Sequence, residues 1–362
     1  MHRMLVGMCA TLLALGCSSF GGAGAPSETP PATSTAAVSP WPVRTSYVLD
    51  LWLHGYAMVQ RDTAQISYFR RDYRDVIVAA KRTRSVSTQL DANAAELTRG
   101  ISANPALISG QFLALQERSW EEMQSDIAAF LEANGDPNSA RDSTMRPAIA
   151  AFAQSYRSQA DRDWLRLFAR SLADEHTRFY EQYWTDRQRE LRPTFLVVDS
   201  LFTHRYLPKL RGYLNNSLLE KGEILLSLPL YGEGRTITSG QHSVAVLFPA
   251  SANSATEAVY TFVHEVATVA TGQAVSDNTT PAQKQSGVAA RYESPAAVRG
   301  GAILLRRTNP ELVAGYERFY LNAARAPASG SDLDGEFART FPLPQVMLDA
   351  IGKEFDRLLS TI

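Results

Sequence analysis

Apolar residues recur at helical spacing through most of the chain after residue 44, and this pattern constrains the fold class more than any other feature. One stretch begins at Asn104-Pro105, an N-cap followed by proline at the first helical position, and stops at Asn134-Gly135. Between these ends the large apolar residues lie on one helical face: Phe112, Leu115, Trp120, Met123, Ile127 and Phe130. The spacing predicts a helical region over residues 45–220.

The periodicity changes after residue 220. Residues 223–230 and 242–248 are two short apolar runs separated by turn-forming residues, and they predict two strands of a small antiparallel sheet. Ser254 and Glu257 then form a capping-box pattern that opens a helix, which is expected to stop near Gly272. The fold class predicted is α+β and predominantly α-helical, with an N-terminal helical array and, over residues 221–362, the sheet followed by C-terminal helices.

Composition excludes several classes of function. The formal net charge of −1 gives no global field that would favour nucleic acid. The two cysteines, Cys9 and Cys17, both precede the predicted helical region, so this body has neither a disulfide nor a thiol nucleophile. Its core must be stabilised by burial alone.

The first residues have the form of an export signal. Arg3 precedes an apolar run over residues 5–15 that is too short to span a bilayer. The run ends in Leu13-Ala14-Leu15-Gly16-Cys17, which resembles a bacterial lipobox. The resemblance implies a signal peptide over residues 1–16 and a lipid on Cys17 that anchors the protein to a membrane of the cell envelope, at the outer membrane or on the periplasmic side. Cleavage after Ala25, which would give a secreted protein, is the alternative.

Residues 17–44 are rich in glycine, serine, threonine, alanine and proline. Such a segment buries too little apolar surface to offset the entropy of ordering it. We therefore expect a flexible tether between Cys17 and the folded body.

The helix predicted after the second strand holds a histidine next to a glutamate, His264-Glu265. A polar stripe runs along this helix through Glu257, Thr261, His264, Thr268 and Thr271. The stripe either faces a cleft or consists of threonines whose hydroxyls bond back to carbonyls of their own helix.

His264-Glu265 and the strands before it resemble the HExxH motif of gluzincins, a branch of the zincin metallopeptidases. In that motif two histidines four positions apart hold Zn²⁺, and the glutamate activates the metal-bound water. Downstream, residues 289–297 resemble the second ligand helix of the family, in which a glutamate supplies the third zinc ligand. The resemblance covers residues 223–325. It implies that His264 and Glu293 bind the metal and that Glu265 is the catalytic base.

Three further patterns bear on the site. Ser294-Pro295 has the form of an N-cap and a first helical residue, which would place Glu293 just before its helix. Asp174-Glu175-His176 contains three potential ligands, but adjacent residues on a helix diverge by about 100°, so a solvated face is predicted there. Gly232-Glu233-Gly234 lacks the strand-to-helix context of a nucleotide-binding loop.

Thr268 stands where the second histidine is expected, and a hydroxyl is a poor zinc ligand. The hypothesis from sequence is therefore an exported, lipid-anchored envelope protein on a zincin-like scaffold, a pseudo-peptidase without zinc. Two alternatives stay open: a non-catalytic helical module that binds a peptide or protein, and an active zinc metallopeptidase with a replacement ligand. A peptidase-derived scaffold should bring His264 and Glu293 together at a cleft, whereas a plain helical module should leave them apart.

Overall fold

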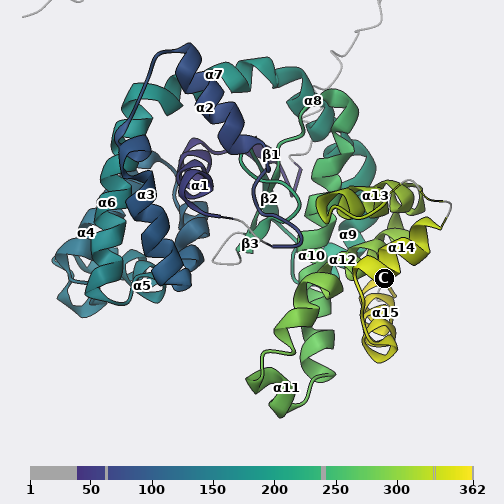
Figure 1. The fold of residues 1–362 in the computed structure, drawn as a ribbon. Coiled ribbons are helices and arrows are strands. Elements are labelled where there is room, and N and C mark those ends of the chain that lie inside the picture. Colours follow the sequence, from purple (N-terminus) through teal and green to yellow (C-terminus); the bar gives the residue numbers. More distant parts are fainter. Residues whose placement is uncertain (1–38, 62–63, 238–241, 329, 331, 361–362) are drawn as a thin grey trace, which may run out of the picture. The chain divides into compact units, whose positions relative to one another are not determined.

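The computed structural model describes residues 39–61, 64–237, 242–328, 330 and 332–360 (Figure 1). The predicted signal peptide over residues 1–16, the predicted lipidation site Cys17 and the predicted tether up to residue 38 lie outside the described residues. Within the described part, none of the helices combines the length and the hydropathy that a membrane-spanning segment requires.

The N-terminal part is helical, as predicted. Its α-helices are α1 (Tyr47–Val59), α2 (Tyr73–Thr83), α3 (Gln89–Ala103), α4 (Trp120–Glu132), α5 (Arg146–Ser155), α6 (Gln159–Glu175), α7 (Glu181–Glu190), α8 (Arg192–Leu201) and α9 (Leu207–Asn216). Helix α1 is buried over almost its whole length, which is expected of a helix that is apolar on all sides. Trp52 packs edge-on against Phe168 of α6, with ring centroids 5.0 Å apart.

The stretch predicted as one helix between Asn104 and Gly135 is two. A 3₁₀ segment, η1 (Pro105–Gln116), comes first, and α4 begins only at Trp120. The break has a local cause, because the Ser119 hydroxyl accepts from the Glu122 backbone N–H and starts a new helix. Both predicted ends are confirmed: the Asn104 side chain caps η1, and Asn134 and Gly135 have φ of 51° and 82° just after α4.

The sheet has four strands, β1 (Val43–Thr45), β2 (Gly222–Ser227), β3 (Arg235–Ile237) and β4 (His242–Leu247), in the order β1-β2-β4-β3. It is mixed, so the predicted antiparallel sheet is wrong. Strands β1, β2 and β4 are parallel, and only β3 runs antiparallel to β4. The segment taken for a turn contains β3, which returns as the hairpin partner of β4 and leaves β2 and β4 connected by a crossover.

The folded body begins before residue 45, so the prediction that residues up to 44 are a flexible segment is wrong for its last residues. Strand β1 pairs with β2, and Trp41 is 1% exposed. The Trp41 ring packs edge-on against Phe262, with centroids 5.5 Å apart. Gly222 makes this possible, because a Cβ there would lie 2.5 Å from the Trp41 ring.

The helix after β4 is α10 (Thr256–Asp277), which packs against β4 and buries residues that include Phe262, Val263 and Val266. It starts and ends later than predicted. Ser251 and Ser254 form a capping box for a short 3₁₀ turn before it, and the helix passes through Gly272 without interruption.

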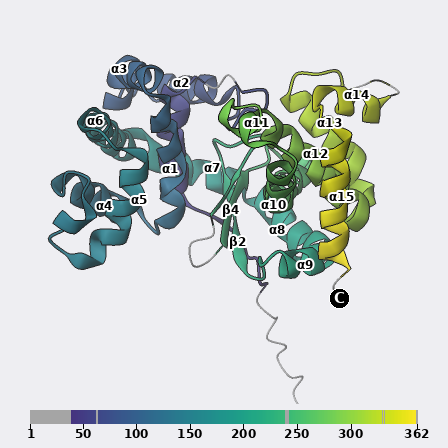
Figure 2. The ribbon, with the colours of Figure 1, turned by 90° about the horizontal axis from the view of Figure 1, so that it is seen from below.

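The remaining helices are α11 (Pro281–Gln285), α12 (Ala290–Thr308), α13 (Val313–Ala323), α14 (Leu333–Thr340) and α15 (Gln345–Leu359). Helices α12 and α15 lie beside α10 (Figure 2). Close approach of α12 to α10 depends on Gly300, because a Cβ there would overlap the methyl group of Thr271. This contact fixes the position of Glu293, which lies on α12, relative to His264 on α10.

Candidate functional site

Helix α10 buries His264 and Glu265 side by side, at 4% and 6% exposure. The His264 Nδ1 lies 2.9 Å from Glu265 Oε1. The other ring nitrogen, Nε2, is buried and has no hydrogen-bond partner. The imidazole is held in place by Tyr320, whose ring stacks on it at 5.4 Å between centroids.

The segment just before β3 also contacts the carboxylate of Glu265. The Gly234 backbone N–H donates to Glu265 Oε1 at 3.0 Å. A Cβ at position 234 would overlap the carbonyl oxygen of Ala245 and lie 3.1 Å from Glu265 Cγ. Glycine is therefore required for the backbone to come this close to Glu265.

A cavity of about 330 Å³ opens here between β3, α10 and α12. Four residues singled out from the sequence line it: His264, Glu265, Thr268 and Glu293. The structure thus brings together side chains from two helices, α10 and α12. The two that are farthest apart in the sequence, His264 and Glu293, are separated by 29 positions.

Glu293 lies inside its helix, and its predicted position before the helix is wrong. Helix α12 begins at Ala290 and continues through Pro295. Ser294 does not act as an N-cap, because its hydroxyl donates instead to Glu233 Oε1 at 3.2 Å. Pro295 lies inside the helix, where it has no N–H to donate to the carbonyl of Arg291, one turn earlier.

Glu233 is a cavity residue that the sequence analysis did not assign. Burial raises the pKa of this carboxyl, as does the charge of Glu265, while His264, Ser294 and Tyr68 act in the opposite direction. Its signal in the sequence was an acid between two glycines just before a strand.

The polar stripe of α10 both lines a cavity and bonds back to carbonyls of its own helix. Thr268 lines the cavity, yet its hydroxyl donates to the backbone carbonyl of Glu265. Thr261 and Thr271 bond back in the same way, to Glu257 at 3.2 Å and to Thr268 at 3.3 Å. The hydroxyl at the position of the missing histidine is therefore engaged with its own helix.

The cavity is acidic, with the carboxylates of Glu233, Glu265 and Glu293 facing Arg235 and His264. Burial disfavours the imidazolium form of His264, but Glu265 and Glu233 outweigh it and raise the pKa of the ring. The donor set does not fit the three-ligand zinc site of the gluzincin motif. His264 is the one histidine among the described residues that line the cavity, and no group of three His, Cys, Asp or Glu side chains placed to hold a metal occurs in the described residues.

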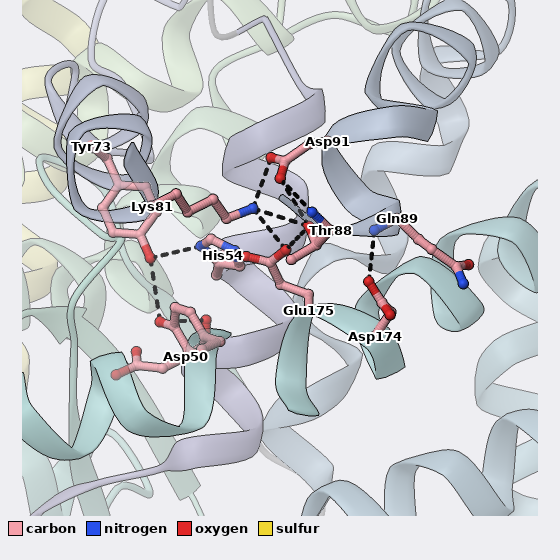
Figure 3. Close-up of polar contacts among 10 residues, drawn as sticks. Asp50, His54, Tyr73, Lys81, Thr88, Gln89, Asp91, Asp174 and Glu175 are labelled. Carbon is pink, nitrogen blue, oxygen red and sulfur yellow. Dashed lines mark hydrogen bonds and ion pairs between the residues drawn. The ribbon is translucent and has the colours of Figure 1, made fainter. Parts of the chain in front are cut away.

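A second polar cluster lies among α1, α2, α3 and α6 (Figure 3). Glu175, which was predicted on a solvated face, is fully buried there, and that prediction is wrong. Its carboxylate lies 3.0 Å from His54 Nε2 and 2.8 Å from Lys81 Nζ, and it accepts a further bond from the Thr88 hydroxyl.

The divergence of the Asp174-Glu175-His176 triplet is as predicted. Asp174 accepts from the Gln89 backbone N–H at 2.7 Å, and His176 Nδ1 lies 2.6 Å from the Tyr47 hydroxyl. Glu175 instead points inward, because α6 lies between other helices and its polar side meets Lys81. The cluster connects helices and is a structural feature, not a ligand site.

Family models, curated proteins and solved structures were each compared with this chain, and none of them matches it. The proposed function therefore rests on the sequence pattern and on the geometry of the cavity.

Proposed function

We propose that this chain is an exported, lipid-anchored envelope protein that uses a zincin-like scaffold to bind an extended polypeptide without hydrolysing it. The order of a mixed sheet, a helix with His264-Glu265 and a second helix with Glu293 supports the scaffold. The observation that carries the proposal is the buried and unpartnered Nε2 of His264 in the cavity lining. A buried polar atom without a partner is costly, and a bound ligand would supply the partner.

Strand β3 gives the cavity a surface suited to a polypeptide. It is the last strand in the sheet order and pairs with β4 on one side. Arg235 and Thr236 of this strand line the cavity, and the Thr236 hydroxyl is also buried without a partner in the described structure. An extended peptide can add to such an edge through backbone hydrogen bonds, while cavity side chains select its residues.

Two features of the site disfavour hydrolysis. Glu265 Oε1 already holds both His264 and the Gly234 N–H, which leaves one carboxylate oxygen for a water. Thr268 supplies no imidazole, so the scaffold lacks the second histidine of the motif.

An active zinc peptidase is the second candidate, and Glu233 is the observation that favours it. This carboxylate comes from a third element, lines the same cavity as His264 and Glu293, and interacts electrostatically with His264. Zinc accepts sets of one imidazole and two carboxylates, although these three side chains are not placed to share a metal ion in the described structure.

Binding of a fluorescein-labelled unfolded casein, followed by fluorescence anisotropy and by gel analysis, tests the proposal. We expect the polypeptide to bind and to remain intact. His264→Gln and Thr236→Val should weaken binding, since each removes one unpartnered cavity group, while Thr185→Val on the exposed side of α7 should not. Cleavage that depends on added zinc would favour the peptidase, and equal binding by all variants would refute the site.

The anchor is tested separately. Cells that express the full chain should incorporate labelled palmitate into it, and Cys17→Ser should abolish the label. Labelling that survives this substitution would contradict lipidation at Cys17.

A further inference from the structure

A larger cavity, of about 620 Å³, lies at the C-terminal end of α1, away from the residues of the candidate site. Its walls come from the end of α1, the segment before α2, the start of α2 and the residues that follow α13. Among the described residues, the lining holds one carboxylate, Asp75, and five arginines: Arg61, Arg70, Arg71, Arg74 and Arg325. So strong an excess of one charge in one concavity focuses an attractive potential on anions.

Two of these guanidinium groups are fixed without being neutralised. Arg71 donates to the backbone carbonyl of Ala323 at 2.7 Å, and Arg74 donates to those of Ala57 and Gln60 at 3.1 and 2.9 Å. Backbone carbonyls orient a guanidinium but leave its full charge. Burial lowers the pKa of Arg74, and repulsion from Arg61 lowers it further, so these two charges lie close together.

Within the part of the chain that the structure describes, one ion pair joins a carboxylate to an arginine of the cavity. Arg70 lies 3.7 Å from Asp72, and both side chains are partly or largely exposed. Within the described residues no carboxylate lies within ion-pair distance of Arg61, Arg71, Arg74 or Arg325. The positive charge in the cavity is therefore available to a ligand.

Two buried polar atoms in the cavity lining give independent evidence for a ligand. Ser67 is 2% exposed and Gln60 is 8% exposed, and both line the cavity. The Ser67 hydroxyl and Gln60 Oε1 have no hydrogen-bond partner in the described structure. A hydroxyl can donate to an anionic oxygen, and an amide oxygen can accept from a hydroxyl or amine on the same ligand.

We propose that this arginine-lined cavity binds the phosphate group of a phosphorylated, hydroxyl-bearing molecule. A phosphomonoester, with its tetrahedral oxygens and double charge, can bind several planar guanidinium groups at once. A ligand with a single carboxylate would suit the cavity less well. The volume is larger than a phosphate ion needs and lies in the range of small-molecule sites. The same chemistry is offered by a soluble sugar phosphate and by a phosphorylated lipid headgroup.

Calorimetric titration of the purified full-length protein with glucose 6-phosphate, and sedimentation with phosphatidylcholine vesicles with or without phosphatidylinositol 4-phosphate, tests the proposal. Binding of the sugar phosphate indicates a soluble source, and binding only to the vesicles that contain phosphatidylinositol 4-phosphate indicates a membrane source. Either outcome supports the site. Failure of both probes to bind would overturn it.

Substitutions identify the cavity as the place of binding. Arg61→Gln and Arg325→Gln remove charge from two exposed side chains. Each should weaken binding about tenfold, as expected for one charge-assisted hydrogen bond. Arg99→Gln, an exposed arginine on α3, is the matched control. Equal weakening by Arg99→Gln and Arg61→Gln would show non-specific attraction and overturn the proposal, and Ser67→Ala should weaken binding while leaving the melting temperature unchanged.

Discussion

At the scale of single residues, the molecule places its ionisable groups in two kinds of surroundings. His264 and Glu265 are buried beside a cavity, and one ring nitrogen has no partner. Glu175 is buried with every oxygen paired, to His54, Lys81 and Thr88. The first arrangement is suited to a ligand, whereas the second is complete in itself and stabilises the helices around it.

Glu175 should therefore control acid stability. Its partners lower the pKa of this carboxyl to about 2, against the opposing effect of burial. A folded-state pKa below the unfolded value of roughly 4.3 means that its contribution is fully present above pH ~4.3 and is lost as the pH falls toward 2. We predict that Glu175→Gln lowers the free energy of unfolding by about 3–5 kcal/mol at pH 7, because Lys81 loses a buried partner.

Urea unfolding at pH 7 and at pH 3 measures both effects. The difference between wild type and Glu175→Gln should be smaller at pH 3 than at pH 7. Glu190→Gln, on an exposed carboxylate of α7, is the control and should change the free energy by less than about 0.5 kcal/mol. A difference that is independent of pH would contradict the role given to the ionised Glu175.

Asp50 has the opposite dependence. Burial raises the pKa of this carboxyl to about 7, even though it accepts from Ser227, Trp184 and the Leu228 N–H. Because its folded pKa lies above the unfolded value of roughly 3.9, its contribution to stability decreases as the pH rises from about 4 to about 7. The contribution of Asp50 to stability therefore changes above pH ~4, whereas that of Glu175 changes below pH ~4.

At the scale of elements, the residue pattern of the sequence predicted the helices better than it predicted the sheet. Apolar spacing and the caps at Asn104 and Asn134 gave helical structure where the protein has it. The sheet was predicted antiparallel because two apolar runs separated by turn residues look like a hairpin. Strand β3 is only three residues long and β1 precedes its partner β2 by about 180 positions, so neither has a local signal.

The candidate site was predicted in part for a similar reason. His264, Glu265 and Glu293 carry a motif that can be recognised along the chain. Glu233 has no such signal, because its place in the cavity depends on how the segment before β3 folds back over α10. The burial of Glu175 likewise follows from the packing of α6 among helices that are distant in sequence.

The contact between α10 and α12 should set both stability and the geometry of the cavity. A Cβ at Gly300 would overlap the methyl group of the buried Thr271, so we predict that Gly300→Ala destabilises the protein by about 1–3 kcal/mol. Thr271→Ser removes that methyl group. The double variant should recover part of the loss, which thermal unfolding of the two single variants and the double variant would measure as a coupling energy.

Gly272→Ala is the control for this experiment, since a Cβ there meets nothing within 4 Å. It should be neutral or should stabilise α10 by up to about 1 kcal/mol. Additive effects of Gly300→Ala and Thr271→Ser would mean that the two helices do not depend on this contact.

At the scale of the whole molecule, the described body combines a helical region, a small mixed sheet and two cavities of opposite charge. The cavity at His264 is lined by three glutamates, and the cavity at Arg61 by five arginines. A net charge of −1 for the chain conceals this separation. We propose that the acidic cavity is a former zinc site that now binds a polypeptide, and that the basic cavity binds phosphate.

Zinc affinity of the Thr268→His variant tests the central claim most directly. Thr268 lies one helical turn after His264 and lines the same cavity, so a histidine there would complete the ligand set with His264 and Glu293. We predict that competition with a zinc-binding dye will show an affinity at least ~100-fold higher than in wild type, since even indirect losses change metal affinity by 10–100-fold. Val269→His, at an exposed neighbouring position, should show no gain. Stoichiometric zinc in the wild-type protein that disappears in His264→Ala, or equal affinities in Thr268→His and Val269→His, would contradict the account.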